Sequence, residues 1–351
     1  MISAVVVNWN GRGYLDACLR ALLAQTPPPD EVILVDNHSD DGSREFVAAQ
    51  FPAVCIVDTG ANLGAAGARN VGIARARGER VLCLDNDVEL APGALRALVT
   101  AMDDDPRCAL VQVRSVVKDR PELLHYDAAD LHYLGTLVLH GFFQPRATAP
   151  RWPAPVGAFV ALGFLVRKDA LLAVGGFDEE LFILYEDNDV SWRLRMHGWN
   201  LRLAADALAV HAGGTAGLSF RSPGARYASR RAYLHARNRW LVLLRNARWR
   251  TLILTLPAQL LYAAVYLGFA CTRGVGFATL RGNCAAFVAW PATLRRRRLI
   301  RGRSVPDRAL LCALPMTANP GLADRGAAAR LRRTLDAVFL AWFRLVRWAC
   351  G

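Results

Sequence analysis

Four short apolar runs, each followed by a stretch with helical spacing, dominate the first third of this 351-residue chain. The runs carry no charged residue, which is typical of strands buried on both faces. Strands that alternate with helices in this way build a parallel sheet covered on both sides. We therefore predict an α/β fold. The expected strands are residues 4–7, 32–35, 54–57 and 81–84, and the expected helices are residues 14–24, 43–50, 65–77 and 92–102.

The alternation breaks after residue 118, where histidines, tyrosines and a tryptophan lie among prolines. We expect residues 118–155 to form an insertion or a lid. A strand is expected at 159–166 and a helix at about 187–197. The predicted domains are residues 1–220, with halves 1–115 and 116–220, and a basic helical region over residues 221–351.

Charge and hydropathy set residues 221–351 apart from the rest. These residues carry 24 Lys+Arg against 3 Asp+Glu, whereas residues 1–220 carry 19 against 27. Residues 251–272 have no charge, and that length is enough to cross a hydrocarbon core. A weaker apolar segment, residues 275–294, ends in four arginines, and an amphipathic helix is expected over 335–349. An acidic N-terminal part and a basic, apolar C-terminal part indicate that the two parts have different binding partners.

Arginine flanks every end of these segments, and positive charge favours the cytoplasmic side of a membrane. A re-entrant or surface-lying helical pair satisfies this pattern better than one span, and the last helix suits the headgroup boundary. The alternative for 251–272 is a buried core helix, and 335–349 could equally be a core-packing helix. The N-terminus reads as a strand, not as a signal peptide. Eight scattered cysteines without a C-x-x-C pair fit a reducing compartment.

Polar residues follow all four expected strands at the point where each ends. In an open α/β sheet, ligands bind at the carboxyl ends of the strands. Each residue alone could serve a turn or a helix cap, but caps need no clustering at one edge. Together they predict a nucleotide site. Its candidate residues are Asn8, Asn10, Asp36, Asn62, Gly64, Arg69, Asp85, Asn86 and Asp87.

Two carboxylate clusters mark the expected chemistry. Asp85 and Asp87 are one residue apart after a buried strand, and a divalent cation would relieve their repulsion. Such oxygen ligands suit Mg²⁺ or Mn²⁺ bridging a diphosphate. His211 ends another expected strand near this inferred cation. The second cluster, Glu186 and Asp187 with Asp189, opens a helix, where acidic residues are also favoured by the helix dipole alone.

In this order the blocks resemble the family 2 glycosyltransferases with the GT-A fold, the bacterial rhamnosyltransferase-like and galactofuranosyltransferase-like branches above all. The resemblance covers roughly residues 1–245. It rests on five motifs: V-V-N-W-N-G, V-D-N-x-S-x-D-G-S, N-x-G-x-A-G-x-x-N-x-G, L-D-N-D, and G-G-F-D-E…Y-E-D-x-D…W-R-x-x-x-x-G-W.

The resemblance implies a role for each matching residue. Asp187 would be the general base, and Asp87 and His211 would ligate the metal. Asn86 departs from the pattern, because many relatives have a carboxylate there. Asp36 would recognise the nucleobase with Asn8 and Asn10. Asp85 would approach the ribose or the donor sugar, and the same nucleotide-sugar site would include Asn62, Gly64, Arg69 and Asn86. Glu186 and Trp192 would hold the acceptor, and a block that follows the catalytic domain in the family resembles Tyr233, Arg237 and Asn238.

The expected activity is metal-dependent sugar transfer with inversion, since one base opposite the leaving group gives a single displacement. The expected donor is a UDP- or dTDP-sugar, with dTDP-rhamnose leading by resemblance. The acceptor would be a glycan or a polyprenyl-linked saccharide, reached at the cytoplasmic face of the bacterial inner membrane by a peripheral or monotopic enzyme bound to anionic lipids. The alternatives are an inactive membrane scaffold of the same fold and a basic nucleic-acid-binding protein. Arginines interleaved with long apolar stretches disfavour a nucleic-acid partner.

Overall fold

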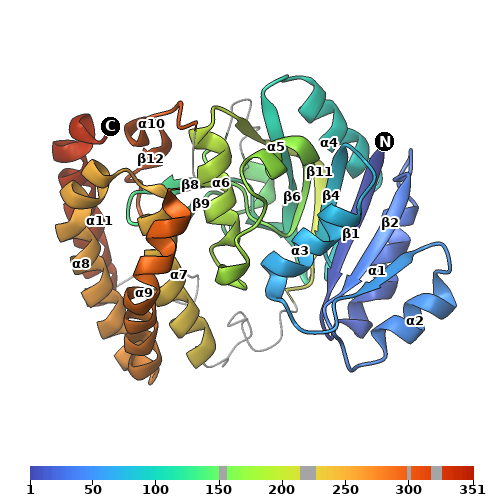
Figure 1. Cartoon of the computed structure of the whole chain (residues 1–351), viewed down its shortest axis with the longest axis horizontal. Coiled ribbons are helices and arrows are strands. Elements are labelled where there is room, and N and C mark those ends of the chain that lie inside the picture. Colours follow the sequence, from blue (N-terminus) through green and yellow to red (C-terminus); the bar gives the residue numbers. More distant parts are fainter. Residues whose placement is uncertain (150–155, 214–226, 299–301, 318–325) are drawn as a thin grey trace.

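The computed structural model describes residues 1–149, 156–213, 227–298, 302–317 and 326–351. Residues 2–211, here called the sheet part, contain a nine-stranded sheet with helices on both faces, and residues 229–346, the helical part, stack beside it (Figure 1). The predicted boundary near residue 220 lies outside the described residues. The α/β prediction is confirmed.

The first half of the sheet follows the predicted alternation closely. Strands β1 to β4 are parallel to their neighbours in the order β3-β2-β1-β4. Each expected strand and helix is present, with ends that differ by a few residues. The bounds are β1 (Ile2–Asn8), α1 (Arg12–Leu23), β2 (Glu31–Asp36), α2 (Ser43–Gln50), β3 (Cys55–Asp58), α3 (Gly64–Arg75), β4 (Arg80–Asp85), β5 (Val88–Leu90) and α4 (Ala94–Asp103).

The second half of the sheet is mixed, which the strand-helix alternation did not predict. Strand β10 enters antiparallel between β4 and β6, and β11 runs parallel to β6 but antiparallel to β5. As a result, residues 161–162 reach the end of β4, where the Asp85 amide donates to the Leu162 carbonyl at 2.9 Å. The bounds are β6 (Cys108–Val117), β7 (Arg120–Tyr126), β10 (Gly163–Arg167), α5 (Lys168–Ala173), α6 (Glu186–Met196) and β11 (Asn200–His211).

Both faces of the sheet are buried. Helices α1 and α4 cover one face through side chains such as Leu19 and Leu98, and α3, α5 and α6 cover the other. Helix α3 approaches β1 closely because residue 72 is glycine: a Cβ there would lie 2.3 Å from a methyl carbon of Val5. Close packing on both sides fixes the carboxyl ends of the strands relative to one another.

The region expected to be a lid is built into the fold. Strand β7 pairs with β6, and strands β8 (Ala129–His132) and β9 (Leu137–Leu139) form a small sheet with β12 (Leu311–Cys312), which follows α10 (Asp307–Leu310). The described residues of 118–149 are therefore an edge of the sheet part that contacts the C-terminal region. Residues 150–155 lie outside the described residues.

Four long helices form the helical part: α7 (Ser229–Asn246), α8 (Trp249–Thr272), α9 (Gly276–Arg297) and α11 (Ala327–Val346). Among the described helices, α8 has the length and composition to cross a membrane, and 17% of its most apolar window is buried. A core helix of a soluble protein would be mostly buried, so this value disfavours the buried-core alternative for residues 251–272. Helix α11 packs on the core through Phe339 and Phe343, which are buried, whereas Val338 and Leu345 are exposed.

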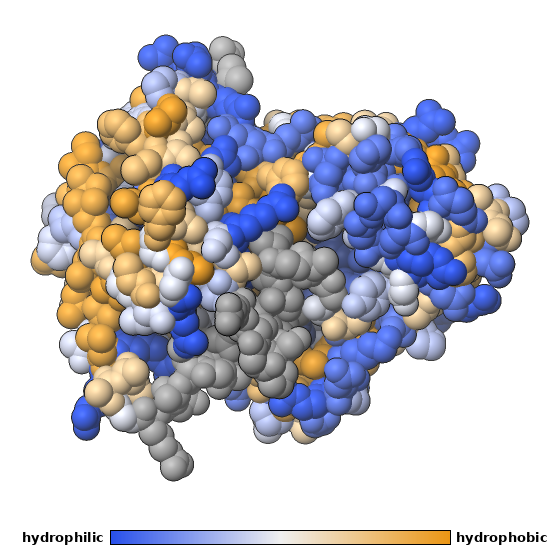
Figure 2. Space-filling model, turned by 90° about the horizontal axis from the view of Figure 1, so that it is seen from below, coloured by the Kyte–Doolittle hydropathy of each residue, from blue (hydrophilic) through white to orange (hydrophobic). Residues whose placement is uncertain are grey.

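Figure 2 shows the result at the surface: hydrophobic residues gather over the helical part, whereas hydrophilic residues cover most of the sheet part. In the helical part, large exposed apolar side chains lie on α8, α9 and α11 and on the residues that follow α11. They include Ile253, Leu256, Leu260, Phe277, Leu280, Phe287, Val288, Leu331, Val338, Leu345 and Trp348.

Candidate active site

A hydrogen-bond network joins the ends of β1, β2 and β4. The Asn8 amide donates to Asp36 at 2.9 Å and to the Ser39 hydroxyl at 3.1 Å. The Asn86 amide donates to Asn8 Oδ1 at 2.7 Å. The strand register explains the contact, because Asn8 pairs with Asp36 and the neighbouring Val7 pairs with Asp85. Residues predicted to share one edge of the sheet do share it.

Within this network, Asp36 is fully buried. One of its oxygens accepts from Asn8, and the other accepts from the Ser39 amide at 2.9 Å. The exposed polar side chain beside it is Asn10, whose backbone φ of 49° is in the left-handed region. Asp36 therefore holds the loop after β2, and a nucleobase bound here would meet the exposed Asn10 side chain.

The start of α3 contacts the loop that precedes α6. Asn62 and Gly64 lie at this start, where the Gly64 amide donates to Asn62 Oδ1 at 2.9 Å. A Cβ at Gly64 would lie 2.3 Å from the Phe182 carbonyl oxygen, and the Ala66 amide donates to that same oxygen at 3.1 Å. With a φ of +71°, this position requires glycine both for its conformation and for the close approach.

Arg69 connects the two carboxylate clusters. Its guanidinium lies 2.7 Å from Asp85 Oδ1 and 2.9 Å from Glu186 Oε1, and it donates to the Ala161 carbonyl at 2.5 Å. The Arg69 side chain is 3% exposed and that of Glu186 7%, so their ion pair is buried, whereas the Asp85 side chain is 34% exposed. The Ala161 backbone also hydrogen-bonds the Asp187 carboxylate. Strand β4 and helix α6 therefore contribute to one site.

Asp187 is the second residue of α6 and is partly buried. Burial, followed by the neighbouring charge of Glu186, raises the pKa of Asp187 to about 7, although hydrogen bonds from the backbone oppose the shift. A carboxyl with a pKa in this range can accept a proton near neutral pH. The preceding residues Phe182, Leu184 and Tyr185 all have positive φ, so the loop that places Asp187 is conformationally demanding.

Two other residues of the same helix have structural roles. Asp189 is fully buried, lies 2.8 Å from Arg193 Nε and accepts from the Asn246 amide at 2.7 Å. Trp192, expected to hold the acceptor, is also fully buried and packs in the hydrophobic cluster with Leu181 and Met196. Because its ring is enclosed by the core, we leave Trp192 out of the candidate site.

Asp87, in the turn between β4 and β5, lies beside His211, the last residue of β11. Asp87 Oδ2 is 3.1 Å from His211 Nε2, and both side chains are less than a tenth exposed. Strand pairing holds them, because His211 is opposite Val88 and the Ala212 amide donates to the Asp87 carbonyl at 3.0 Å. His125, which the sequence did not single out, lies behind His211 with 2.8 Å between their Nδ1 atoms.

These groups fit a divalent cation as part of its ligand set. No group of three or more His, Cys, Asp or Glu side chains placed to hold a metal occurs among the described residues. One carboxylate and one imidazole nevertheless suit Mg²⁺ or Mn²⁺ when substrate phosphates and water supply the remaining ligands. The pair is consistent with a cation that arrives with an anionic substrate.

Helix α7 supports the demanding loop before α6. The Asn238 amide donates to the carbonyls of Leu181 and Leu184, both at 2.8 Å, and to Ile183 at 3.1 Å. Arg237 donates to the Glu180 carbonyl at 2.8 Å. The block expected to follow the catalytic domain thus holds the backbone that positions Asp187. Tyr233 lies one turn earlier, on the side facing α9.

Comparison with known proteins points the same way. Residues 3–171 match the family model for glycosyl transferase family 2. The N-acetylglucosaminyl-diphospho-decaprenol L-rhamnosyltransferase of Mycobacterium tuberculosis is 32% identical over 222 residues, which take in 57% of this chain and 72% of that protein. The succinoglycan biosynthesis protein ExoO of Rhizobium meliloti is 32% identical over 145 residues, 41% of this chain and 42% of that protein.

Among solved structures, the mannosyltransferase PcManGT from Pyrobaculum calidifontis, in complex with GDP-Man and Mn²⁺, covers 99% of this chain and 86% of its own. The two share 18% sequence identity and superpose with a TM-score of 0.49. A likeness of this size supports no conclusion about ligands or reaction.

Proposed function

Because the chain belongs to the family 2 glycosyltransferases and is a rhamnosyltransferase-like member with a GT-A fold, we propose that it moves a sugar from a UDP- or dTDP-linked donor to a hydroxyl of a lipid-linked saccharide. The observation that carries the proposal is the placement of Arg69. Its guanidinium pairs with Asp85 at the end of β4 and with Glu186 at the start of α6. This placement supports a single site that contains both the donor edge and the expected base.

The donor would lie along the ends of β1 to β4. Asn10 would face the base, with the buried Asn8 and Asp36 holding the loop beneath it. Asp85 would face the ribose or the sugar, with Asn62, Gly64, Arg69 and Asn86 around it. The Asn8–Asp36–Asn86 network supports this arrangement, because it holds the side chains before any ligand arrives. A preorganised site loses less free energy on ordering when the donor binds.

Asp187 would accept the proton of the acceptor hydroxyl, and Glu186 would hold a neighbouring hydroxyl. A sugar hydroxyl is a weak nucleophile at neutral pH, so a base must take its proton as the new bond forms. The raised pKa of Asp187 suits it to that transfer. With one base on the face opposite the leaving group, the anomeric carbon would invert.

Asp87 and His211 would hold the divalent cation, which supplies positive charge to the leaving diphosphate. Both side chains are buried, and the pairing of β11 with β5 already holds them beside each other. No change of strand pairing is therefore needed for both to bind the cation. His125 would orient the His211 ring through their shared hydrogen bond.

The acceptor and the donor sugar are proposed from the relative. The mycobacterial enzyme is named for rhamnose transfer to N-acetylglucosaminyl-diphospho-decaprenol. We infer an acceptor of the same class, reached at the cytoplasmic face of the membrane through the apolar surface of the helical part, and rhamnose as the leading donor sugar. The enzyme would be peripheral or monotopic and would act in polysaccharide biosynthesis.

The test is a panel of UDP- and dTDP-sugars, incubated with the full chain, Mn²⁺ or Mg²⁺ and a prenyl-diphosphate-linked N-acetylglucosamine, with product detected by mass spectrometry. We expect one donor to give a lipid-linked disaccharide and EDTA to abolish it. Turnover that persists in EDTA would contradict the role of Asp87 and His211. Failure of every donor and acceptor would favour the inactive scaffold, and retardation of DNA at moderate salt would favour the nucleic-acid alternative.

A further inference from the structure

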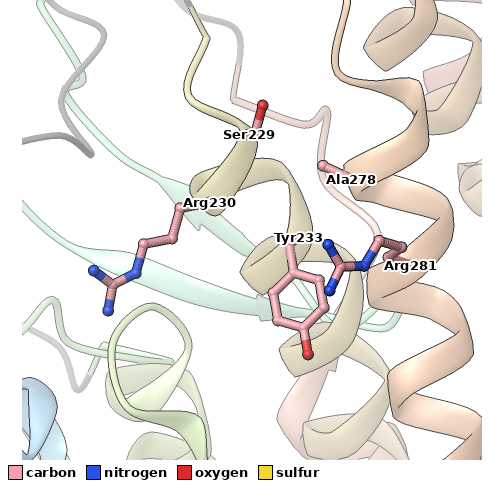
Figure 3. A pocket seen from close by; sticks show the side chains of 5 residues that line it. All are labelled: Ser229, Arg230, Tyr233, Ala278 and Arg281. Atoms are coloured by element: carbon pink, nitrogen blue, oxygen red, sulfur yellow. The ribbon is translucent and has the colours of Figure 1, made fainter.

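A pocket of about 240 Å³ lies between α7 and α9, beyond the residues that match the family model (Figure 3). Two guanidinium groups and two hydroxyl groups line it, and no acidic side chain does. The Tyr233 and Arg281 side chains lie side by side and can both donate hydrogen bonds, so this end of the pocket suits an anion (Figure 3). The lining residues are Ser229, Arg230, Tyr233, Ala278 and Arg281.

The two arginines of the pocket differ from the other arginines nearby. Arg245 and Arg296 both form ion pairs with Asp178, whereas Arg230 and Arg281 are exposed and form no ion pair within the described part of the chain. Their positive charge is therefore available to a ligand. Guanidinium groups recognise phosphate through paired hydrogen bonds, which makes a phosphate group the best match.

The backbone fixes the spacing of the pocket. At Gly282 the two helices approach so closely that a Cβ would lie 2.4 Å from the Tyr233 carbonyl oxygen. The Trp240 indole also donates to Asn283 across the same pair of helices at 3.0 Å. Arg281, next to Gly282, is consequently held beside Tyr233 (Figure 3).

One side chain of the pocket reaches the loop that precedes α6. Arg230 lies over the Phe182 ring, 4.9 Å from its centre, and its guanidinium points away from Tyr233 (Figure 3). The Phe182 carbonyl is the group that binds the start of α3, and Glu186 and Asp187 follow four and five residues later. Arg230 therefore links the pocket to the loop that leads to Glu186 and Asp187.

An exposed apolar surface continues from the pocket along α9. Phe277 and Leu280, which neighbour Ala278 and Arg281 in sequence, are 75% and 50% exposed, and Phe287 and Val288 extend the surface by two turns. A ligand with a phosphate head and a long apolar tail matches both features together.

We propose that this pocket binds the diphosphate of a polyprenyl-diphosphate-linked acceptor, with the prenyl chain along the exposed side of α9. This inference rests on the proposed function, which takes such an acceptor. Arg281 and Tyr233 hold one phosphate, and Arg230 directs the saccharide end toward Asp187. An anionic phospholipid shares the phosphate chemistry, but it has no need of an arginine that reaches the loop before Glu186 and Asp187.

The test measures binding of farnesyl diphosphate, farnesol and inorganic pyrophosphate to the full chain in neutral detergent by calorimetry. It compares the double variant Arg230→Ala, Arg281→Ala with the matched control Arg250→Ala, Arg344→Ala, which removes the same charge from exposed positions of α8 and α11. We expect farnesyl diphosphate to bind at least tenfold more weakly to the pocket variant and unchanged to the control. Farnesol has no phosphate, so both variants should bind it with the same affinity.

Equal loss in the control, or no loss in the pocket variant, would overturn the proposal. A pocket variant that loses binding to phosphatidylglycerol vesicles but keeps farnesyl diphosphate would also overturn it, because the pocket would then be a headgroup site. In turnover, the acceptor KM should rise while the donor KM stays the same. Wild-type chain that binds farnesyl diphosphate but transfers no sugar would reject the proposed function and leave the pocket standing.

Discussion

The sheet part and the helical part depart from ordinary burial in opposite directions. In the sheet part, charged and amide side chains such as Asp36, Arg69 and Asp87 are buried and hydrogen-bonded. In the helical part, large apolar side chains such as Phe287 and Val288 face outward. Globular proteins usually do neither without a reason, because both arrangements cost free energy. The difference is what we expect if the sheet part carries the proposed chemistry and the helical part contacts an apolar partner.

The largest expected effect concerns the chemistry of the sheet part. Asp187→Asn removes the base but keeps the size of the side chain, so we expect kcat to fall by about 10² to 10⁴-fold. Donor affinity, measured by calorimetry with Mn²⁺, should stay the same. The control Asp103→Asn changes an exposed carboxylate that pairs only with Arg80 among the described residues and should leave kcat unchanged. Unchanged turnover in Asp187→Asn would remove the base from this residue.

The second prediction compares a Phe-to-Ala substitution in the sheet part with one in the helical part. Phe164→Ala in β10 empties a fully buried site and should lower the free energy of unfolding by about 3–5 kcal/mol. Phe287→Ala in α9, where the ring is 70% exposed, should change it by about 0.5 kcal/mol or less. Urea unfolding of the two variants measures both. An equal cost would mean that α9 is covered in solution, and the contrast between the parts would fail.

A smaller effect is expected behind the proposed metal ligands. His125→Ala removes the ring that shares a hydrogen bond with His211, so the Mn²⁺ concentration for half-maximal activity should rise by about 10 to 100-fold. His125→Asn, which can still hydrogen-bond, should restore part of that loss. His140→Ala, a partly buried histidine paired with Asp130, is the control. A fall in kcat without a shift in metal dependence would make His125 a packing residue.

The smallest effect is on pH dependence. Because the pKa of Asp187 is raised to about 7, its carboxylate form is the minor one at pH 6 and the major one at pH 8. The base must be deprotonated to act, so kcat should rise about tenfold between these values. In Asp187→Asn the residual rate should lose this rise. A wild-type rate that falls over the same range would contradict the assignment.

The sequence located the sheet, its helices and the shared edge because those depend on local periodicity and on strand order. It could not show that β10 enters antiparallel, because a strand's direction depends on contacts far along the chain. The ion pairs of Arg69 were hidden for the same reason: Glu186 is 117 residues away. His125 has no local pattern around it that marks a site.

Burial explains the remaining differences. Trp192 lies in a motif, but a motif does not say which side of α6 faces the core, and the structure encloses its ring. Asp36 was correctly placed at the strand end, yet its complete burial follows from Asn8 and Ser39, which surround it only in the folded chain. In the sequence, Arg230 and Arg281 look no different from Arg245 and Arg296, which form ion pairs. Only the folded structure shows that the first two form no ion pair among the described residues.

Arg69 carries a consequence for how this molecule can be divided. A single guanidinium, buried and shared by carboxylates that lie 101 positions apart, cannot be satisfied by either half alone. A fragment that ends near residue 115 would keep this cation and Asp85 but lose Glu186, together with β10 and β11, which flank β4 and β6 in the sheet. On the proposed roles, donor recognition and acceptor activation are not separable modules, and exchanging one half with that of a relative would have to carry over its matching counter-ion.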